Sequence, residues 1–268
     1  MPVNDTGSEF ARESQRLAEV LREAGEIARK TFRGEIRSWI KAHNSPVSDA
    51  DIAVDAFLRE TLSRPGIGWL SEESVDDLAR LNAERIYIVD PIDGTRSYLA
   101  GQEDWSISAA LVERGRPVAA AVYAPVLGDM YVASAGGGAT RNGAAIEATK
   151  GAALEGARIA GPQHYLERIA KAVPGAVVMP KIHSLALRLA RVAGGQIDAA
   201  FASVNARDWD LAAADLLVHE AGGTMTGVSG EPLVYNLHSP VHGALIAAGR
   251  ARHNTLISLA RDNRTYFS

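Results

Sequence analysis

The chain has 268 residues, enough for one large domain or two closely joined lobes around a buried core. Apolar residues make up 47% of the chain and charged residues 22%, which is the composition of an ordinary water-soluble globular protein. The formal net charge of −4, without a run of lysine or arginine, argues against nucleic-acid binding through a basic face, and the lack of cysteine excludes disulfides and thiolate chemistry.

The location of the protein is predicted from what the sequence lacks. No apolar run approaches the length that spans a membrane, and the first residues have neither the basic nor the apolar segment of a secretion signal. The lack of cysteine also fits a reducing compartment. We therefore expect a cytoplasmic protein with no membrane partner.

Two helices are predicted first along the chain. Apolar residues recur at helical spacing from Ser8 to about Phe32. Pro46 then favours an extended segment, and Ser48 is placed to cap a helix that runs to about Leu62. Asp51 lies in the first turn of this helix, where the helix dipole alone would favour a carboxylate.

A short strand from Ile67 to Leu70 is predicted to end at two acidic residues, Glu72 and Glu73. Neighbouring residues of an extended chain point to opposite sides, so only one of this pair can face a site beyond the strand end.

The most informative stretch spans residues 86–98. Ile86 to Val89 predict a strand, and we expect Asp90-Pro91 to stop it, because proline lacks a ladder donor and fixes φ. Asp90 and Asp93 then lie on a tight turn, where the Gly94 and Thr95 amides can point at an anion. The turn is open to two interpretations: a structural turn in which the carboxylates bind local amides, or a site for a hard cation and a phosphate.

Further strands follow in two groups. Runs at 105–112, 117–123 and 130–133 predict an antiparallel meander, and the glycine-rich stretch 136–143 predicts a plain turn because it matches no nucleotide-binding fingerprint. From residue 157 on, strands alternate with helices, which implies parallel pairing. The strands are predicted near 157–160, 176–179, 197–201 and 243–248, and the helices near 163–172, 184–193, 210–221 and 250–261. We expect lobes at 1–150 and 151–268, with the site in the crevice between them.

Two of the later helices begin at polar residues. Ser184 is placed to cap its helix and to aim the first amides at the crevice, and the preceding His183 is predicted to be a rim or packing residue. Trp209-Asp210 opens a helix of small residues, where Asp210 is either a helix cap or a metal ligand. Asp215 is given no catalytic role.

Three blocks taken together carry a resemblance: Leu70-Ser71-Glu72-Glu73-Ser74, residues 86–98, and Trp209-Asp210 with the later Glu220-Ala221-Gly222-Gly223. They resemble the inositol monophosphatase superfamily of metal-dependent phosphomonoesterases, over nearly the whole chain from residue 10 to 245. The fold class expected is α/β with α+β character. It is a layered αβαβα sandwich with an N-terminal antiparallel sheet lobe and a C-terminal, mostly parallel α/β lobe. The resemblance also implies a homodimer.

The resemblance assigns a metal site to these blocks. Glu72, Asp90, Asp93 and Asp210 provide hard oxygen ligands that suit Mg²⁺, and zinc is not expected without cysteine or clustered histidine. By resemblance alone, the Ile92 carbonyl joins the set, Asp51 helps to hold a weaker ion through water, and two or three ions are bound. The chain departs from the family pattern at Ser48, where relatives have threonine, and at His183, where they have glycine.

The implied reaction is hydrolysis of a phosphomonoester by metal-activated water. Thr95, held near Glu72, would orient and deprotonate that water, with Asp93 also assigned to catalysis. Asp93, Gly94, Thr95, Ser184 and Asp210 would contact the substrate.

The substrate is expected to be a small phosphorylated metabolite. Residues 199–207 contain no acid, whereas inositol-selective relatives carry a glutamate there, and Leu70-Ser-Glu-Glu with Val122-Tyr-Ala-Pro125 look like the 3′(2′),5′-bisphosphate nucleotidase branch, which acts on 3′-phosphoadenosine 5′-phosphate. Arg96 and Arg207 are either contacts of a second phosphate or ordinary surface residues.

Other functions stay open at this point. Inositol monophosphatase follows as an alternative, and histidinol phosphatase comes third. A regulatory partner protein of the same fold is the non-enzymatic alternative. A calcium-binding module would need a contiguous ligand loop, which the sequence lacks.

Overall fold

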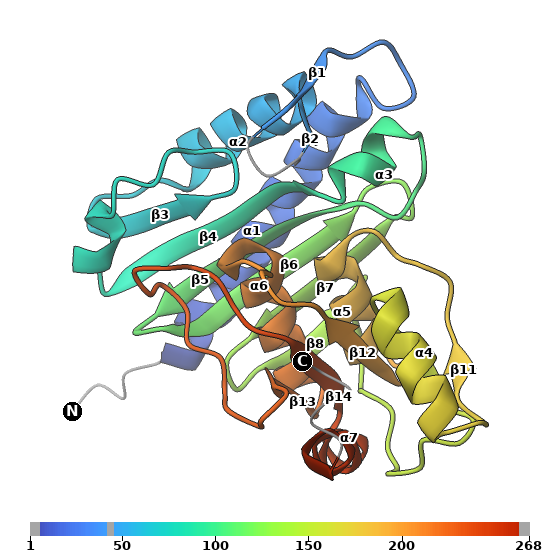
Figure 1. Ribbon diagram of the computed structural model, residues 1–268. Coiled ribbons are helices and arrows are strands. Elements are labelled where there is room, and N and C mark those ends of the chain that lie inside the picture. Colours follow the sequence, from blue (N-terminus) through green and yellow to red (C-terminus); the bar gives the residue numbers. More distant parts are fainter. Residues whose placement is uncertain (1–5, 42–45, 263–268) are drawn as a thin grey trace, which may run out of the picture.

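The computed structural model describes residues 6–41 and 46–262, which form five alternating layers of helices and sheets (Figure 1). Helices α1 and α2 cover one face of a seven-stranded sheet, α5 and α6 lie between this sheet and a five-stranded sheet, and α4 and α7 cover the far face of the second sheet. This confirms the α/β sandwich expected from the sequence. No helix of the described ranges is long and apolar enough to cross a membrane.

The helices follow the predicted segments closely, except that the short helix α3 was not predicted. Leu17, Leu21, Ala24 and Ala28 of the first helix are fully buried at helical spacing against the seven-stranded sheet. Each buried leucine contributes about 1.5–3 kcal/mol relative to an exposed one. The helices are α1 (Thr6–Arg29), α2 (Asp49–Leu62), α3 (Thr95–Leu99), α4 (Gln163–Ala172), α5 (Leu185–Ala193), α6 (Asp208–Glu220) and α7 (Arg250–Asp262), with a 3₁₀ turn at Ala79–Asn82.

The seven-stranded sheet has the order β3-β4-β5-β6-β7-β8-β9. Its pairings are antiparallel, except that β3 runs parallel to β4. The meander expected at 105–133 is therefore confirmed, while the glycine-rich stretch 136–143 holds a short strand besides its turn. The strands are β3 (Ile67–Ser71), β4 (Arg85–Asp93), β5 (Ser106–Glu113), β6 (Arg116–Ala124), β7 (Asp129–Ser134), β8 (Gly138–Arg141) and β9 (Ala144–Ala145); a separate hairpin joins β1 (Ser38–Ile40) to β2 (Pro46–Ser48).

One boundary prediction in this sheet is wrong. Strand β4 does not stop at Asp90-Pro91 but continues to Asp93. The β4–β5 register shifts between Asp90 and Asp93, and β3 pairs with β4 only as far as Val89. The missing N–H of Pro91 therefore falls where the ladder is already interrupted, so it costs the sheet no hydrogen bond.

The five-stranded sheet has the order β11-β10-β12-β14-β13. Parallel pairing is confirmed for β10 with β11 and with β12, but β14 is antiparallel to both β12 and β13. The cause is strand β13, which the sequence analysis missed and which forces the next strand to return in the opposite direction. The strands are β10 (Arg158–Ala160), β11 (Val177–Val178), β12 (Ala199–Ala202), β13 (Gly223–Gly227) and β14 (Leu245–Gly249).

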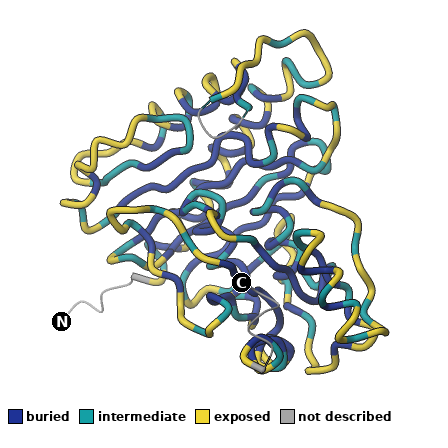
Figure 2. The backbone as a smooth tube through the Cα atoms, viewed as in Figure 1, coloured by how far each residue is buried: buried dark blue, intermediate teal, exposed yellow. Residues whose placement is uncertain are grey.

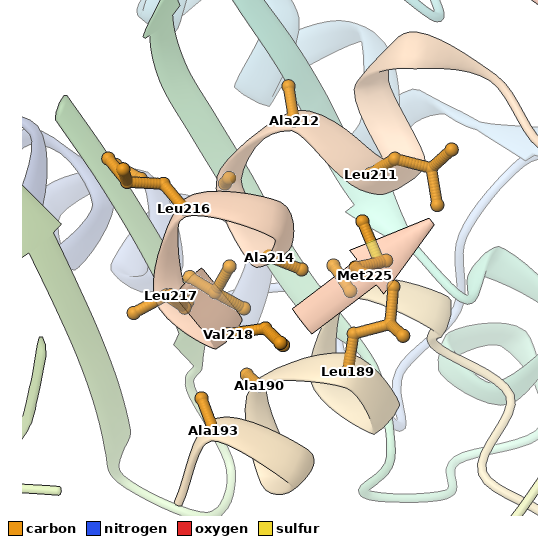
Figure 3. Packing of buried hydrophobic residues seen from close by; sticks show 14 of the residues in the cluster. Leu189, Ala190, Ala193, Leu211, Ala212, Ala214, Leu216, Leu217, Val218 and Met225 are labelled. Atoms are coloured by element: carbon orange, nitrogen blue, oxygen red, sulfur yellow. The ribbon is translucent and has the colours of Figure 1, made fainter. Parts of the chain in front are cut away.

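The central core lies between the two sheets. Buried side chains of α5 and α6 meet Met225 of β13 in one cluster, where Ala190, Ala193 and Ala214 let the two helices approach closely (Figure 3). The central strands of both sheets are buried along most of their length, and the exposed residues are concentrated in loops, outer helix faces and the short strands β1, β9 and β11 (Figure 2). This packing fixes the first turns of α5 and α6, which carry part of the candidate site. The division into lobes near residue 150 stays a prediction.

Candidate active site

The turn after β4 brings the chain close to the start of α5. Gly94 has φ of 93°, in the left-handed region, and a Cβ there would lie 3.1 Å from the Ser184 amide nitrogen and 3.4 Å from the Asp104 carbonyl oxygen. Glycine is therefore required by both the backbone angle and the space. The close approach sets Asp93 directly against the first residues of α5.

Three carboxylates converge at this turn. Asp90, Asp93 and Asp210 each offer one oxygen, and these oxygens all lie within 4.8 Å of one another. Asp90 is 1% exposed, and neither of its carboxylate oxygens has a hydrogen-bond partner in the described part of the chain. Burial raises the pKa of Asp90 well above its usual value, and repulsion from Glu72, Asp93 and Asp210 adds to this. A cation with a preference for oxygen ligands fits this arrangement, because it would neutralise the repulsion and satisfy the orphaned oxygens.

Glu72 lies at the end of β3, on the same cavity as the three aspartates. Its pKa is raised to about 7, mainly by burial. The ammonium group of Lys41, whose Nζ lies 3.6 Å from Glu72 Oε1, offsets part of this rise. The neighbouring Glu73 does not line the cavity, and both of its carboxylate oxygens accept hydrogen bonds from Lys41 Nζ at 2.7 Å. Only Glu72 of this pair therefore lines the cavity, although both carboxylates lie near Lys41 Nζ.

Asp93 is held by the beginning of α5. Its Oδ2 accepts hydrogen bonds from Ser184 Oγ and from the Ala186 amide, both at 2.6 Å. Ser184 Oγ also accepts from the Leu187 amide at 3.0 Å and lies 2.9 Å from Ser106 Oγ. Ser184 is fully buried and does not line the cavity, so its predicted contact with substrate does not fit the structure. The helix end binds the Asp93 carboxylate instead, and the same carboxylate belongs to the acidic cluster.

Asp210 lies in the first turn of α6, two residues after the helix begins. Its Oδ2 accepts a hydrogen bond from the Arg207 amide at 2.7 Å. Burial and repulsion from Asp93 raise its pKa well above the usual value. Both predicted roles are therefore compatible with the geometry: one oxygen caps the helix, and one reaches the acidic cluster.

Thr95 connects the turn to α2. Its Oγ1 lies 3.0 Å from Asp51 Oδ1 and 3.0 Å from the Ile92 carbonyl oxygen, each an acceptor for its proton. Asp51 Oδ2 accepts from the Ser48 amide at 2.8 Å and from Ser48 Oγ at 2.5 Å, which confirms that Ser48 begins this helix. Burial raises the pKa of Asp51. Sequence reasoning missed this pairing of Thr95 with Asp51. The metal contacts predicted for Asp51 and the Ile92 carbonyl stay predictions.

A cavity of about 600 Å³ joins these groups. Its acidic part consists of Glu72, Asp90, Asp93 and Asp210, next to Gly94 and Thr95. Its remaining wall is cationic and apolar, with Arg96, Lys181, His183, Arg188, Leu166, Met179 and Ile182 among the lining residues. Sequence reasoning missed Lys181 and Arg188. No local pattern singled out Arg188, because its position at the cavity depends on how α5 is anchored to β12.

Arg96, Arg207 and His183 differ in their position relative to the cavity. Arg96 is exposed at the cavity, whereas Arg207 does not line it and lies with its guanidinium carbon 5.9 Å from the centre of the Trp209 ring. His183 is half-buried at the cavity wall, where its amide and its Nδ1 lie 2.7 and 2.9 Å from Asp104 Oδ2. It therefore ties the start of α5 to the loop before β5.

Comparison with known proteins gives consistent matches. A model described as the inositol monophosphatase family matches residues 10–265. An inositol-1-monophosphatase of Rhizobium meliloti is 33% identical over 228 residues, which cover 80% of this chain and 85% of that protein. A 3′(2′),5′-bisphosphate nucleotidase CysQ of Aggregatibacter actinomycetemcomitans is 28% identical, covering 83% and 87%. The crystal structure of extragenic suppressor protein suhB from Bartonella henselae superimposes with a TM-score of 0.79 at 27% identity, covering 90% of this chain and 95% of that chain.

Proposed function

The chain belongs to the inositol monophosphatase family, and from that premise we propose that it is a Mg²⁺-dependent phosphatase that hydrolyses a small phosphomonoester with water. One observation carries the proposal. Asp90 is a buried carboxylate with both oxygens unpaired in the described structure, surrounded by further carboxylates. Burying such a group is energetically unfavourable unless a cation binds it.

Glu72, Asp90, Asp93 and Asp210 are the proposed ligands, together with the Ile92 carbonyl. When bound there, Mg²⁺ supplies the positive charge that makes water more acidic and stabilises negative charge developing on the departing oxygen. Two or three ions, as the family resemblance implies, remain part of the proposal.

The chain's own groups are proposed to handle the proton of the attacking water. Thr95 Oγ1 takes that proton while its own proton passes to Asp51 Oδ1, 3.0 Å away. Burial raises the pKa of Asp51, which makes this carboxylate a better proton acceptor. Asp51 thus replaces Glu72 as the proposed partner of Thr95. The Gly94 and Thr95 amides remain the proposed contacts of the phosphoryl oxygens.

The leading substrate is a 3′(2′),5′-bisphosphate nucleotide such as 3′-phosphoadenosine 5′-phosphate. Cationic residues beyond the acidic cluster, Arg96, Lys181 and Arg188, support a substrate with a second phosphate. A similar protein bears the nucleotidase name. Inositol monophosphatase is the second candidate, because a relative of 33% identity has that name. A homodimer and a cytoplasmic location are further proposals that rest on resemblance.

Phosphate release from 3′-phosphoadenosine 5′-phosphate, inositol 1-phosphate and histidinol phosphate tests the proposal. We expect no release by metal-stripped protein, release once Mg²⁺ is added, and the highest kcat/KM on the bisphosphate nucleotide. A higher kcat/KM on inositol 1-phosphate would replace the leading substrate with the second candidate. No release from any of the three at saturating Mg²⁺ would refute the phosphatase assignment.

A further inference from the structure

Arg188 is a cationic residue of the cavity that the reaction described above does not use. It lies on α5, and one of its guanidinium nitrogens donates to the Phe201 carbonyl oxygen of β12 at 3.1 Å. Its Nε is buried and has no hydrogen-bond partner in the described part of the chain. A guanidinium has five N–H donors, so the hydrogen bond to Phe201 anchors the group and leaves other donors for a ligand.

The charges around Arg188 support an anionic ligand. The charged groups that act on it are Asp93 and Asp210. Both are ligands of the proposed metal site, so this inference rests on the proposed function. Glu72, Asp90, Asp93 and Asp210 carry four negative charges when ionised, which two Mg²⁺ ions would balance. The guanidinium would then have no protein counter-ion left, and a buried charge without a partner is unfavourable.

The position of Arg188 indicates which part of a substrate it meets. Asp90 and Asp93 belong to β4 of the seven-stranded sheet, whereas Arg188 lines the cavity from α5 and is hydrogen-bonded to β12 of the five-stranded sheet. We propose that Arg188 binds a second, non-reacting phosphate of the substrate and so sets a preference for bisphosphorylated over monophosphorylated substrates. A guanidinium suits this task because it can donate two parallel hydrogen bonds to a phosphate.

The test compares two substrates that share the reacting phosphate. Adenosine 3′,5′-bisphosphate and adenosine 3′-monophosphate differ only in the second phosphate. For Arg188→Met we expect the ratio of kcat/KM on the bisphosphate to that on the monophosphate to fall about 10- to 100-fold, the effect of losing a hydrogen bond to a charged group. Arg188→Lys keeps the charge but loses the paired geometry, so its ratio should lie between those of Met and wild type.

Arg191 offers a matched control. It lies on the same helix, its Nε is likewise buried without a hydrogen-bond partner among the described residues, and it does not line the cavity. Arg191→Met should leave the ratio unchanged. Calorimetric titration of both nucleotides with Ca²⁺ in place of Mg²⁺ measures binding with little turnover. Arg188→Met should lose affinity for the bisphosphate by the same factor while keeping its affinity for the monophosphate.

Two results would overturn the inference. Equal losses on both substrates would mean that Arg188 acts on the transferred phosphoryl group or on the fold, and an unchanged ratio would mean that it contacts no second phosphate. The proposed function fails in a different way, because wild-type protein would then release phosphate from neither nucleotide at saturating Mg²⁺.

Discussion

Replacing Asp90 by asparagine should stabilise the metal-free protein and reduce the stability that it gains from Mg²⁺. In the metal-free protein, Asp90 is buried with both oxygens unpaired, beside Glu72, Asp93 and Asp210. Asparagine keeps the shape, removes one charge from this repulsive cluster, and adds an amide that can donate to a neighbouring carboxylate. Leaving a buried polar group unsatisfied costs about 1–3 kcal/mol, so metal-free Asp90→Asn should unfold several degrees above wild type.

Magnesium should narrow or remove this difference, because it stabilises wild type more than the variant. At a concentration one hundred times its Kd, a ligand stabilises the folded state by about 2.7 kcal/mol. Loss of a ligating charge should weaken binding by at least about 10- to 100-fold, which leaves the variant a gain of roughly 0.4–1.4 kcal/mol at the same concentration. Turnover should fall at least about 100-fold.

Differential scanning calorimetry with a chelator and with Mg²⁺ measures both effects. Asp215→Asn is the control. Asp215 lies on the same helix as Asp210 and burial raises its pKa to about 6, but its carboxylate accepts a hydrogen bond from Tyr235 at 3.0 Å and lies outside the acidic cluster. Its Mg²⁺ response should match wild type. If Mg²⁺ stabilised Asp90→Asn as much as wild type, or if the metal-free variant were less stable, the assignment of Asp90 as a metal ligand would be wrong.

Three further predictions concern the same site. Thr95→Ala should lose about 10²–10⁴ in kcat with little change in Tm or Mg²⁺ affinity, whereas Thr95→Ser should stay active; an alanine variant that keeps most of its kcat would make Thr95 structural. Burial raises the pKa of Glu72 from 4.5 to about 7, so its contribution to metal-free stability is fully present below pH 4.5 and is lost as the pH rises through 7. Thermal unfolding of Glu72→Gln across this window should show a smaller decrease than wild type, and identical curves would contradict the burial argument. A chelator should abolish phosphate release, Mg²⁺ should restore it and Ca²⁺ should restore it poorly; full activity in the chelator would exclude a metal-dependent reaction.

Local sequence patterns predicted most of the elements because each has a strong physical cause. The helical spacing of Leu17, Leu21 and Ala24 marks a helix with one buried face, and Ser48 marks the beginning of the next. The convergence of Asp90, Asp93 and Asp210 was predictable in kind, because each lies at the end of a strand or the beginning of a helix. That these distant positions lie close together in space was inferred only from the family resemblance.

Long-range geometry accounts for what was missed. Strand β13 is short and bounded by glycines, so its sequence carries little strand signal. Because β13 was not predicted, the antiparallel direction of β14 was not predicted either. Thr95 pairs with Asp51, which lies 44 residues away, and that contact depends on how α2 packs against β4. Arg188 faces the cavity only because α5 is anchored on β12, which no local pattern reveals.

Anomalous diffraction from crystals soaked in Mn²⁺ would test the metal site most directly, since Mn²⁺ accepts the same oxygen ligands as Mg²⁺. We predict at least one strong peak at coordinating distance from an Asp90 oxygen, shared with Asp93 and Asp210, and no such peak in Asp90→Asn. A fully soaked crystal with strong peaks elsewhere on the protein but none among these three carboxylates would contradict the account.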